Sequence, residues 1–134
     1  MHFIDLDAER VYQIHEDILS ESAGLSGICP DKSLESALHR VINHAVYDDL
    51  HDLFEIAALY GESIAQGHIF NDANKRTSLI SMYVFLELNG YILNISDDEA
   101  ADTMVMIAEK QITRKKIAEW LENNSQPIIE ETDL

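Results

Sequence analysis

Apolar residues recur along most of this chain at the three- and four-residue spacing of amphipathic helices. In the N-terminal half this spacing predicts three helices. The first is capped by Asp5 or Asp7. The second starts at Asp31, and the third ends at Gly67. The residues that share one stripe of each helix are Ala8, Val11, His15, Ile18 and Leu19 in the first helix, Leu34, Ala37, Leu38, Val41, Ile42 and Ala45 in the second, and Leu50, Leu53, Phe54, Ala57, Tyr60 and Ile64 in the third.

The fourth predicted helix differs from the others because it is apolar around most of its circumference. It covers residues 74–88 and stops before Gly90. A helix with this pattern is surrounded by other elements, so we expect it at the centre of the fold. Residues 91–95 are expected to form either a short strand or an extended link.

Two more helices are predicted from their capping residues. Ser96 and Glu99 have the spacing of a capping box for a fifth helix. Thr113 caps a sixth helix, which carries Trp120. The whole pattern predicts an all-α fold, a compact bundle of about six helices around a central apolar helix.

Length and composition indicate a single domain. The chain has 134 residues and a hydrophobic content of 46%, which is enough for one core. We expect the domain to cover residues 1–124. Residues 125–134 include Pro127 and two adjacent glutamates and have little to bury, so they are expected to form a flexible acidic tail.

The chain is strongly acidic, with 25 Asp and Glu against nine Lys and Arg and a formal net charge of −16. This charge repels duplex DNA and anionic membranes, which argues against direct binding of nucleic acid or membrane. The longest run without Asp, Glu, Lys, Arg or His, residues 77–86, is too short to span a membrane, and the chain does not open like a secretory signal. The single cysteine, Cys29, fits a cytoplasmic protein without disulfides.

The densest chemistry lies between the third and fourth helices, in the run His68-Ile-Phe-Asn-Asp-Ala-Asn-Lys-Arg76. Lys75 and Arg76 fall in the first turn of a helix, where the helix dipole disfavours a cation by about 0.3–1 kcal/mol unless an anion binds there. The free N–H groups of a helix start, these two cations and the carboxylate of Asp72 predict a phosphate site with a divalent metal ion. His68 adds a side chain that can accept a proton near neutral pH.

A simpler interpretation of the same run is a structural one. Asn71, Asp72 and Asn74 are ordinary turn and capping residues, and Phe70 can anchor the loop in the core. This interpretation leaves one fact unexplained, because it gives no reason for His68 to occur beside two cations at the unfavourable end of a helix.

The run resembles the signature of the Fic/Doc family, whose AMP-transferring members read His-x-Phe-x-(Asp/Glu)-Gly-Asn-Gly-Arg-x-x-Arg. Three positions depart from it: Ala73 and Lys75 replace the two glycines, and Leu79 replaces the second arginine. These departures are the pattern of the Doc branch, the toxins of plasmid and phage addiction modules, which resemble this chain in length and along most of it. The matching positions are His68, Phe70, Asp72, Asn74 and Arg76.

The resemblance implies a role for each polar residue. His68 would be the general base and Asp72 the ligand of Mg²⁺. Asn74, Lys75 and Arg76 would hold the phosphates of ATP, and the two cations would also offset the charge that develops during transfer. The resemblance to the Doc branch further implies a reversed nucleotide, so that the γ-phosphate is transferred and the product is a phosphorylated hydroxyl.

Two alternatives to a kinase stay open. The first is Fic-type AMP transfer, which is disfavoured by Ala73, Lys75 and Leu79. The second is a catalytically silent relative that only binds a partner or nucleotide, which is disfavoured by the presence of His68 and every other expected polar group. Gln66 stands where relatives often carry an arginine, so the strength of ATP binding is an open question.

The resemblance also implies partners. In the Doc branch the target is a threonine of elongation factor Tu, and its phosphorylation stops translation. Many Fic relatives inhibit themselves with a helix reading Ser/Thr-x-x-x-Glu-Gly/Asn, but no Ser or Thr of this chain is followed four residues later by Glu. We therefore expect a separately encoded antitoxin of the Phd type, with a disordered segment that folds into an apolar groove beside the motif.

Other titratable clusters carry weaker signals. The pair His51-Asp52 has the letters of a metal-phosphohydrolase dyad, but a helix start explains it better. His15 is expected at the surface or at its boundary. The basic run 114–116 opens a predicted helix and is expected to form a solvated face or a partner contact.

Overall fold

A computed structural model of the protein describes residues 3–129, and six helices make up most of this part of the chain. A short antiparallel strand pair completes it. The arrangement confirms the predicted all-α bundle of about six helices. In order, the elements are α1 (Ala8–Glu21), α2 (Leu34–Tyr47), α3 (Leu53–Gln66), α4 (Asn74–Leu88), β1 (Tyr91–Leu93), α5 (Asp97–Ala108), α6 (Arg114–Asn123) and β2 (Ser125–Pro127).

Most of the helices begin at a polar capping side chain. Ser33, rather than the predicted Asp31, caps α2, because Asp31 lies in a turn closed by a hydrogen bond from the Lys32 N–H to the Cys29 carbonyl. Five side chains accept a hydrogen bond from a backbone N–H of the first turn, namely Asp7, Ser33, Asp52, Ser96 and Thr113. The start of α4 has no such cap.

The predicted capping box of α5 is half formed. The hydroxyl of Ser96 accepts a hydrogen bond from the Glu99 N–H at 3.3 Å. The Glu99 carboxylate, however, accepts a hydrogen bond from the indole N–H of Trp120 at 3.0 Å. Glu99 therefore ties α5 to α6, a contact that local spacing does not reveal.

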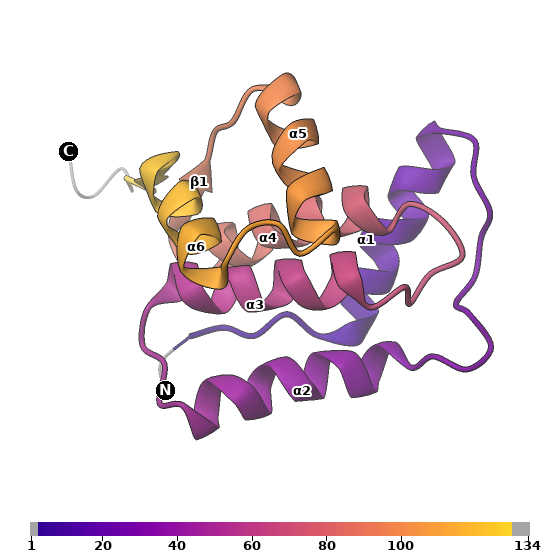
Figure 1. The fold of residues 1–134 in the computed structure, drawn as a ribbon, viewed down its shortest axis with the longest axis horizontal. Helices are drawn as coiled ribbons and strands as arrows, with labels where there is room; N and C mark the ends of the chain where they lie inside the picture. Colours follow the sequence, from indigo (N-terminus) through magenta and orange to yellow (C-terminus); the bar gives the residue numbers. More distant parts are fainter. Residues whose placement is uncertain (1–2, 130–134) are drawn as a thin grey trace.

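Helices α3 and α4 lie side by side at the centre of the bundle (Figure 1). Contacts from α3 reach α2, α4, α5 and α6, whereas α4 contacts α1, α3, α5 and β1. Nine of the 14 residues of α3 are buried, against six of the 15 residues of α4. The central position predicted for α4 alone is therefore shared, and α3 is the more enclosed of the two.

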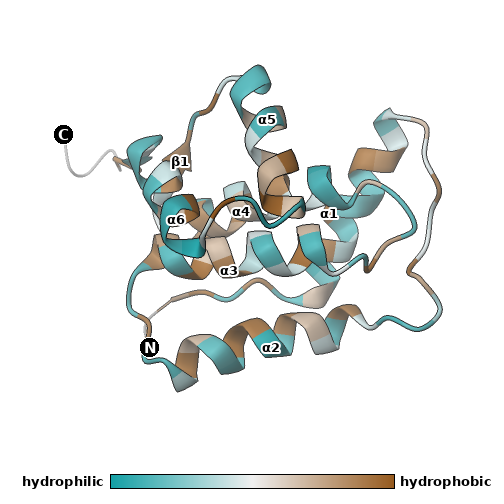
Figure 2. Cartoon of the chain, viewed as in Figure 1, coloured by the Kyte–Doolittle hydropathy of each residue, from teal (hydrophilic) through white to brown (hydrophobic). Residues whose placement is uncertain are grey.

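Helix α5 shows how the other helices face this centre. Its first turn is acidic and solvated, and its last turns are apolar where they approach α3. Figure 2 shows this gradient along α5, from hydrophilic at its start to hydrophobic at its end. No helix in the described part of the chain is long and apolar enough to cross a membrane.

The segment after α6 differs from the prediction. Ser125–Pro127 forms β2 and pairs with β1, which settles the predicted alternatives for residues 91–95 in favour of a strand at Tyr91–Leu93. The flexible tail expected from Ser125 therefore does not begin there, because backbone hydrogen bonds hold these residues to the sheet. Residues 130–134 lie outside the described part of the chain.

Small residues allow α3 and α4 to approach closely. The buried hydroxyl of Ser78 in α4 donates a hydrogen bond to the Gly61 carbonyl in α3 at 2.6 Å. A Cβ atom on Gly61 would collide with the side chain of Met82. This contact fixes where the chain leaves α3 and enters α4, and so fixes the loop between them.

We predict that Gly61→Val lowers the free energy of unfolding by about 1–3 kcal/mol, because the added side chain overpacks the contact between α3 and α4. Urea unfolding followed by circular dichroism measures this change. Ser36→Val, which places the same side chain on the exposed face of α2, is the control. Equal stability of the two variants would contradict the close approach.

Candidate active site

The loop from α3 to α4 is anchored by two consecutive apolar side chains. Ile69 and Phe70 are both buried in the core. His68, just before them, is exposed. The loop is therefore held from below while its histidine faces solvent, as the sequence predicts for Phe70 and His68.

Asn74 closes this loop upon itself. Its side-chain oxygen accepts a hydrogen bond from the Phe70 N–H at 3.1 Å, and its amide donates one to the Phe70 carbonyl at 3.0 Å. The side chain thus sets the shape of the loop, a function that the motif alone does not reveal. One amide hydrogen stays free for an incoming oxygen atom.

Two residues of the loop adopt the left-handed backbone conformation. His68 has a φ of 49° and Ala73 a φ of 63°. A residue with a Cβ atom pays about 1–2 kcal/mol for this conformation, and glycine does not. Strain of this kind is found most often at functional sites.

The start of α4 lacks a side-chain cap because Ala73 occupies the capping position. The backbone N–H groups of residues 74–76 have no partner within the helix. The carbonyl of Ala73 already accepts hydrogen bonds from the N–H and the hydroxyl of Thr77. The other five helix starts have a side-chain acceptor for part of these groups, whereas this one leaves its N–H groups and its positive dipole charge open to an anion nearby.

A cavity of about 310 Å³ opens at this helix start. The structure thereby brings all the predicted site residues to one place. Lys75 and Arg76 are both exposed, and Lys75 forms no ion pair with any residue between 3 and 129. The predicted residues that line the cavity are His68, Asp72, Asn74, Lys75 and Arg76.

Asp72 is held as a carboxylate by two backbone groups. Its oxygens accept hydrogen bonds from the N–H of Ala73 at 2.8 Å and the N–H of Leu25 at 3.3 Å. These two bonds lower the pKa of Asp72, and the nearby charge of Arg76 lowers it further. Asp72 is therefore ionised throughout the neutral and mildly acidic range.

The carboxylate of Asp72 suits one type of metal ion. Each of its oxygens has a second lone pair that can face the cavity. No group of three or more His, Cys, Asp or Glu side chains in the described residues could enclose an ion. A single carboxylate beside an uncapped helix start fits Mg²⁺, which is usually held by one or two carboxylates together with substrate phosphates.

The glycine-rich segment 22–30 packs along the loop. The N–H of Cys29 donates to the Ile69 carbonyl at 2.8 Å, and the N–H of Asn71 donates to the Gly27 carbonyl at 3.1 Å. The guanidinium of Arg76 donates to the Ser22 hydroxyl at 2.7 Å. A segment far away in the sequence therefore supports the loop that carries the site.

Comparison with known proteins agrees with this geometry. The sequence profile of the Fic/DOC family matches residues 5–86, which include α1 to α3, the whole loop and most of α4. The chain belongs to the Fic/Doc family. It is 36% identical over 116 residues to the protein kinase Doc of Escherichia phage P1, an alignment that covers 87% of this chain and 91% of that protein.

The structure shows the surroundings of two residues that depart from the Fic signature, Ala73 and Leu79. Ala73 has the positive φ that a glycine accepts without strain. Leu79, in place of the second arginine, is half-buried and packs against the core. It lines an apolar cavity of about 350 Å³ between α1 and α4, together with Ile18 and Ile80.

The secondary candidates have structural roles. Asp52 caps α3 and accepts hydrogen bonds from the N–H groups of Phe54 and Glu55, which supports the helix-start interpretation. His51 is exposed and lies 3.2 Å from the carboxylate of Asp49. In the basic run 114–116, Arg114 pairs with Glu62 at 2.7 Å.

His15 is the residue of this Fic/Doc site that sequence analysis missed. The expectation of a surface or boundary position was wrong, because its side chain is fully buried. Its ring stacks on Phe70 with centroids 3.9 Å apart, and its Nε2 lies 3.0 Å from the Asp72 carbonyl. A carbonyl oxygen only accepts hydrogen bonds, so Nε2 is the donor. His15 therefore supports two residues of the loop, Phe70 by stacking and Asp72 by a hydrogen bond to its backbone.

We predict that His15→Leu lowers the free energy of unfolding by about 1–3 kcal/mol, because it leaves the Asp72 carbonyl without its donor. It should also raise the Mg²⁺ concentration needed for half-maximal activity, since the backbone that positions the Asp72 carboxylate loses one of its contacts. His15→Gln keeps an N–H donor at a similar place and should restore most of the Mg²⁺ response. If the two variants need the same Mg²⁺ concentration as the unchanged protein, His15 has no positioning function.

Proposed function

We propose that this protein is the toxin of a toxin–antitoxin module and acts in the cytoplasm as an ATP- and Mg²⁺-dependent protein kinase. One observation carries the proposal. A proton acceptor, a carboxylate and two cations line one cavity at the uncapped start of α4, in a chain similar to a protein kinase over most of its length.

The residues of the cavity have complementary roles in this reaction. His68 accepts the proton of the attacking hydroxyl, and its exposure lets a protein substrate reach it. The hydroxyl oxygen bonds to the γ-phosphorus of ATP while the bond from that phosphorus to the β–γ bridging oxygen breaks, and ADP leaves. Lys75, Arg76 and the N–H groups of the α4 start bind the phosphate oxygens and stabilise their charge.

Asp72 would hold the metal ion. When bound, Mg²⁺ would neutralise part of the charge of the phosphates. The two backbone hydrogen bonds to Asp72 and the support from His15 fix the carboxylate in place. A carboxylate that is already fixed in the right place contributes more to the reaction rate than one that must first be ordered.

Transfer of the γ-phosphate agrees better with this site than transfer of AMP. The second arginine of the Fic signature, which holds the outer phosphates in AMP-transferring relatives, is replaced by the half-buried apolar Leu79. Lys75 adds a charged side chain where those relatives have glycine. These two changes support the reversed nucleotide implied by the resemblance to the Doc branch.

The proposed target is a threonine of elongation factor Tu, again from the resemblance to the Doc branch. The proposed inhibitor is an antitoxin of the Phd type. An apolar cavity lined by Ile18, Leu79 and Ile80 lies directly beside Arg76 and suits an amphipathic helix. A helix docked there would cover the edge of the phosphate site.

Incubation with elongation factor Tu and ATP labelled in the γ position should transfer the label. Intact-protein mass spectrometry should show the gain of one phosphate. Label arriving from the α position instead would identify AMP transfer as the reaction, and no modification at all would contradict the proposed target.

His68→Asn should lower the transfer rate by about 100-fold or more, because the general base is lost. Asparagine tolerates the positive φ at this position, so the fold should be retained. Asp72→Asn keeps an oxygen acceptor for the N–H of Ala73, loses the one for the N–H of Leu25, and should abolish the response to Mg²⁺. Asp98→Asn in the acidic first turn of α5 is a charge-matched control and should behave like the unchanged protein.

Expression of this chain alone should stop growth, and co-expression with its antitoxin should restore growth through a complex that survives purification. Ile80→Glu places a charge in the apolar cavity and should weaken that complex while kinase activity is kept. Rescue of growth by the neighbouring gene product without a complex would contradict direct inhibition.

A further inference from the structure

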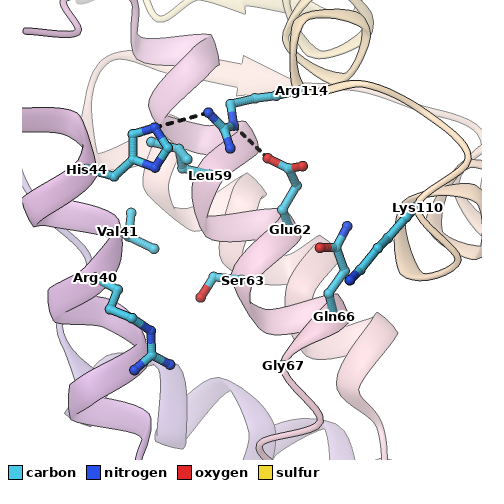
Figure 3. Close-up of a pocket in the computed structure, with 10 residues that line it drawn as sticks. All are labelled: Arg40, Val41, His44, Leu59, Glu62, Ser63, Gln66, Gly67, Lys110 and Arg114. Carbon is cyan, nitrogen blue, oxygen red and sulfur yellow. Dashed lines mark hydrogen bonds and ion pairs between the residues drawn. The ribbon is translucent and has the colours of Figure 1, made fainter. Parts of the chain in front are cut away.

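A second cavity, of about 370 Å³, lies between α2, α3 and the loop that joins α5 to α6. Figure 3 shows cationic side chains around it from three separate elements: Arg40 from α2, Lys110 from the loop and Arg114 from α6. Ser63 and Gln66 of α3 add polar groups between them. The cavity is therefore polar and mainly cationic.

This concentration of positive charge runs against the composition of the chain. Three of its nine Lys and Arg residues line one cavity, although acidic residues outnumber basic ones by 25 to nine. Glu62 is the acidic residue in the lining, and it pairs with Arg114. Arg40 and Lys110 form no ion pair with any of residues 3–129, so their charges are available to a ligand.

The cavity continues to the active site. An adjoining cavity of about 520 Å³ shares Arg40, Gln66 and Gly67 with it and extends past Asp31 and Lys32 to His68. His68 also lines the phosphate cavity at the start of α4. The two joined cavities therefore form a groove, here called the basic groove, that leads from Arg114 to the proton acceptor.

We propose that the basic groove binds acidic residues that flank the acceptor hydroxyl of the protein substrate. This inference rests on the proposed kinase function and names what that kinase recognises. The groove meets the phosphate cavity at His68, so a chain lying in it brings its hydroxyl to the base and the phosphate together. The cations are distributed along its length, which suits carboxylates spaced along an extended segment rather than one compact anion.

The cations of the basic groove act against the negative net charge of the whole protein. A chain of net charge −16 repels an acidic substrate at long range. Cations confined to one groove attract acidic residues only when the substrate approaches in the right orientation. Electrostatic complementarity of this kind contributes specificity more than affinity.

The test is a paired charge reversal, Arg40→Glu with Lys110→Glu, assayed with elongation factor Tu as the protein substrate. The KM for the protein should rise by about tenfold, and its dependence on salt should reverse, because attraction becomes repulsion and salt screens both. The kcat and the KM for ATP should stay within about twofold, since neither residue lines the phosphate cavity. Lys115→Glu with Lys116→Glu, two exposed residues of α6, makes the same change in net charge and should leave all three constants unchanged.

A binding measurement separates this inference from the kinase proposal. Two fluorescein-labelled peptides of equal length carry one threonine, flanked by glutamates in the first and by serines in the second. Fluorescence anisotropy should show tighter binding of the glutamate peptide to the unchanged protein, and the charge-reversed variant should lose this preference. Failure to phosphorylate elongation factor Tu would contradict the proposed target. The peptide binding measurement would still show whether the basic groove prefers acidic residues. Equal binding of the two peptides to the unchanged protein, or an unaltered KM in the charge-reversed variant, would overturn the inference.

Discussion

The contact between α3 and α4 is the constraint on which the site depends. Ser78 and Gly61 bring the two helices together, and both ends of the loop that joins them are set by this contact. Phe70 then anchors the loop in the core, and Asn74 closes it through two hydrogen bonds to the Phe70 backbone. Side chains on such a loop are placed by packing rather than by their own preferences, which is what a preorganised site requires.

The end of the same loop, at the start of α4, has several features that lower the stability of a helix. Five helix starts are capped by a side chain, whereas the start of α4 has an alanine with a positive φ and cations in its first turn. Each of these features is unfavourable in an isolated helix. A phosphate group bound there, as we propose, would satisfy the unpaired N–H groups, the dipole and the cations at once.

The net charge of this molecule and the local charge at its cavities have opposite signs. The whole chain is strongly acidic, yet Lys75 and Arg76 stand at the phosphate cavity, and Arg40, Lys110 and Arg114 line the basic groove. Long-range repulsion and short-range attraction can therefore act on the same approaching molecule. Within about 10 Å, the screening length at moderate salt, the local cations dominate over the distant carboxylates.

The sequence by itself determined the helical class and the helix starts to within a few residues, because these depend on local spacing and capping. It also predicted which residues the structure brings to one cavity. The motif from His68 to Arg76 is contiguous, so a single loop brings it together. Tertiary structure alone decided the burial of His15 under Phe70, the pairing of Ser125–Pro127 with β1 and the greater enclosure of α3. It also decided the basic groove, whose residues come from three parts of the chain. Burial and long-range pairing depend on which elements meet in space, and local periodicity does not contain that information.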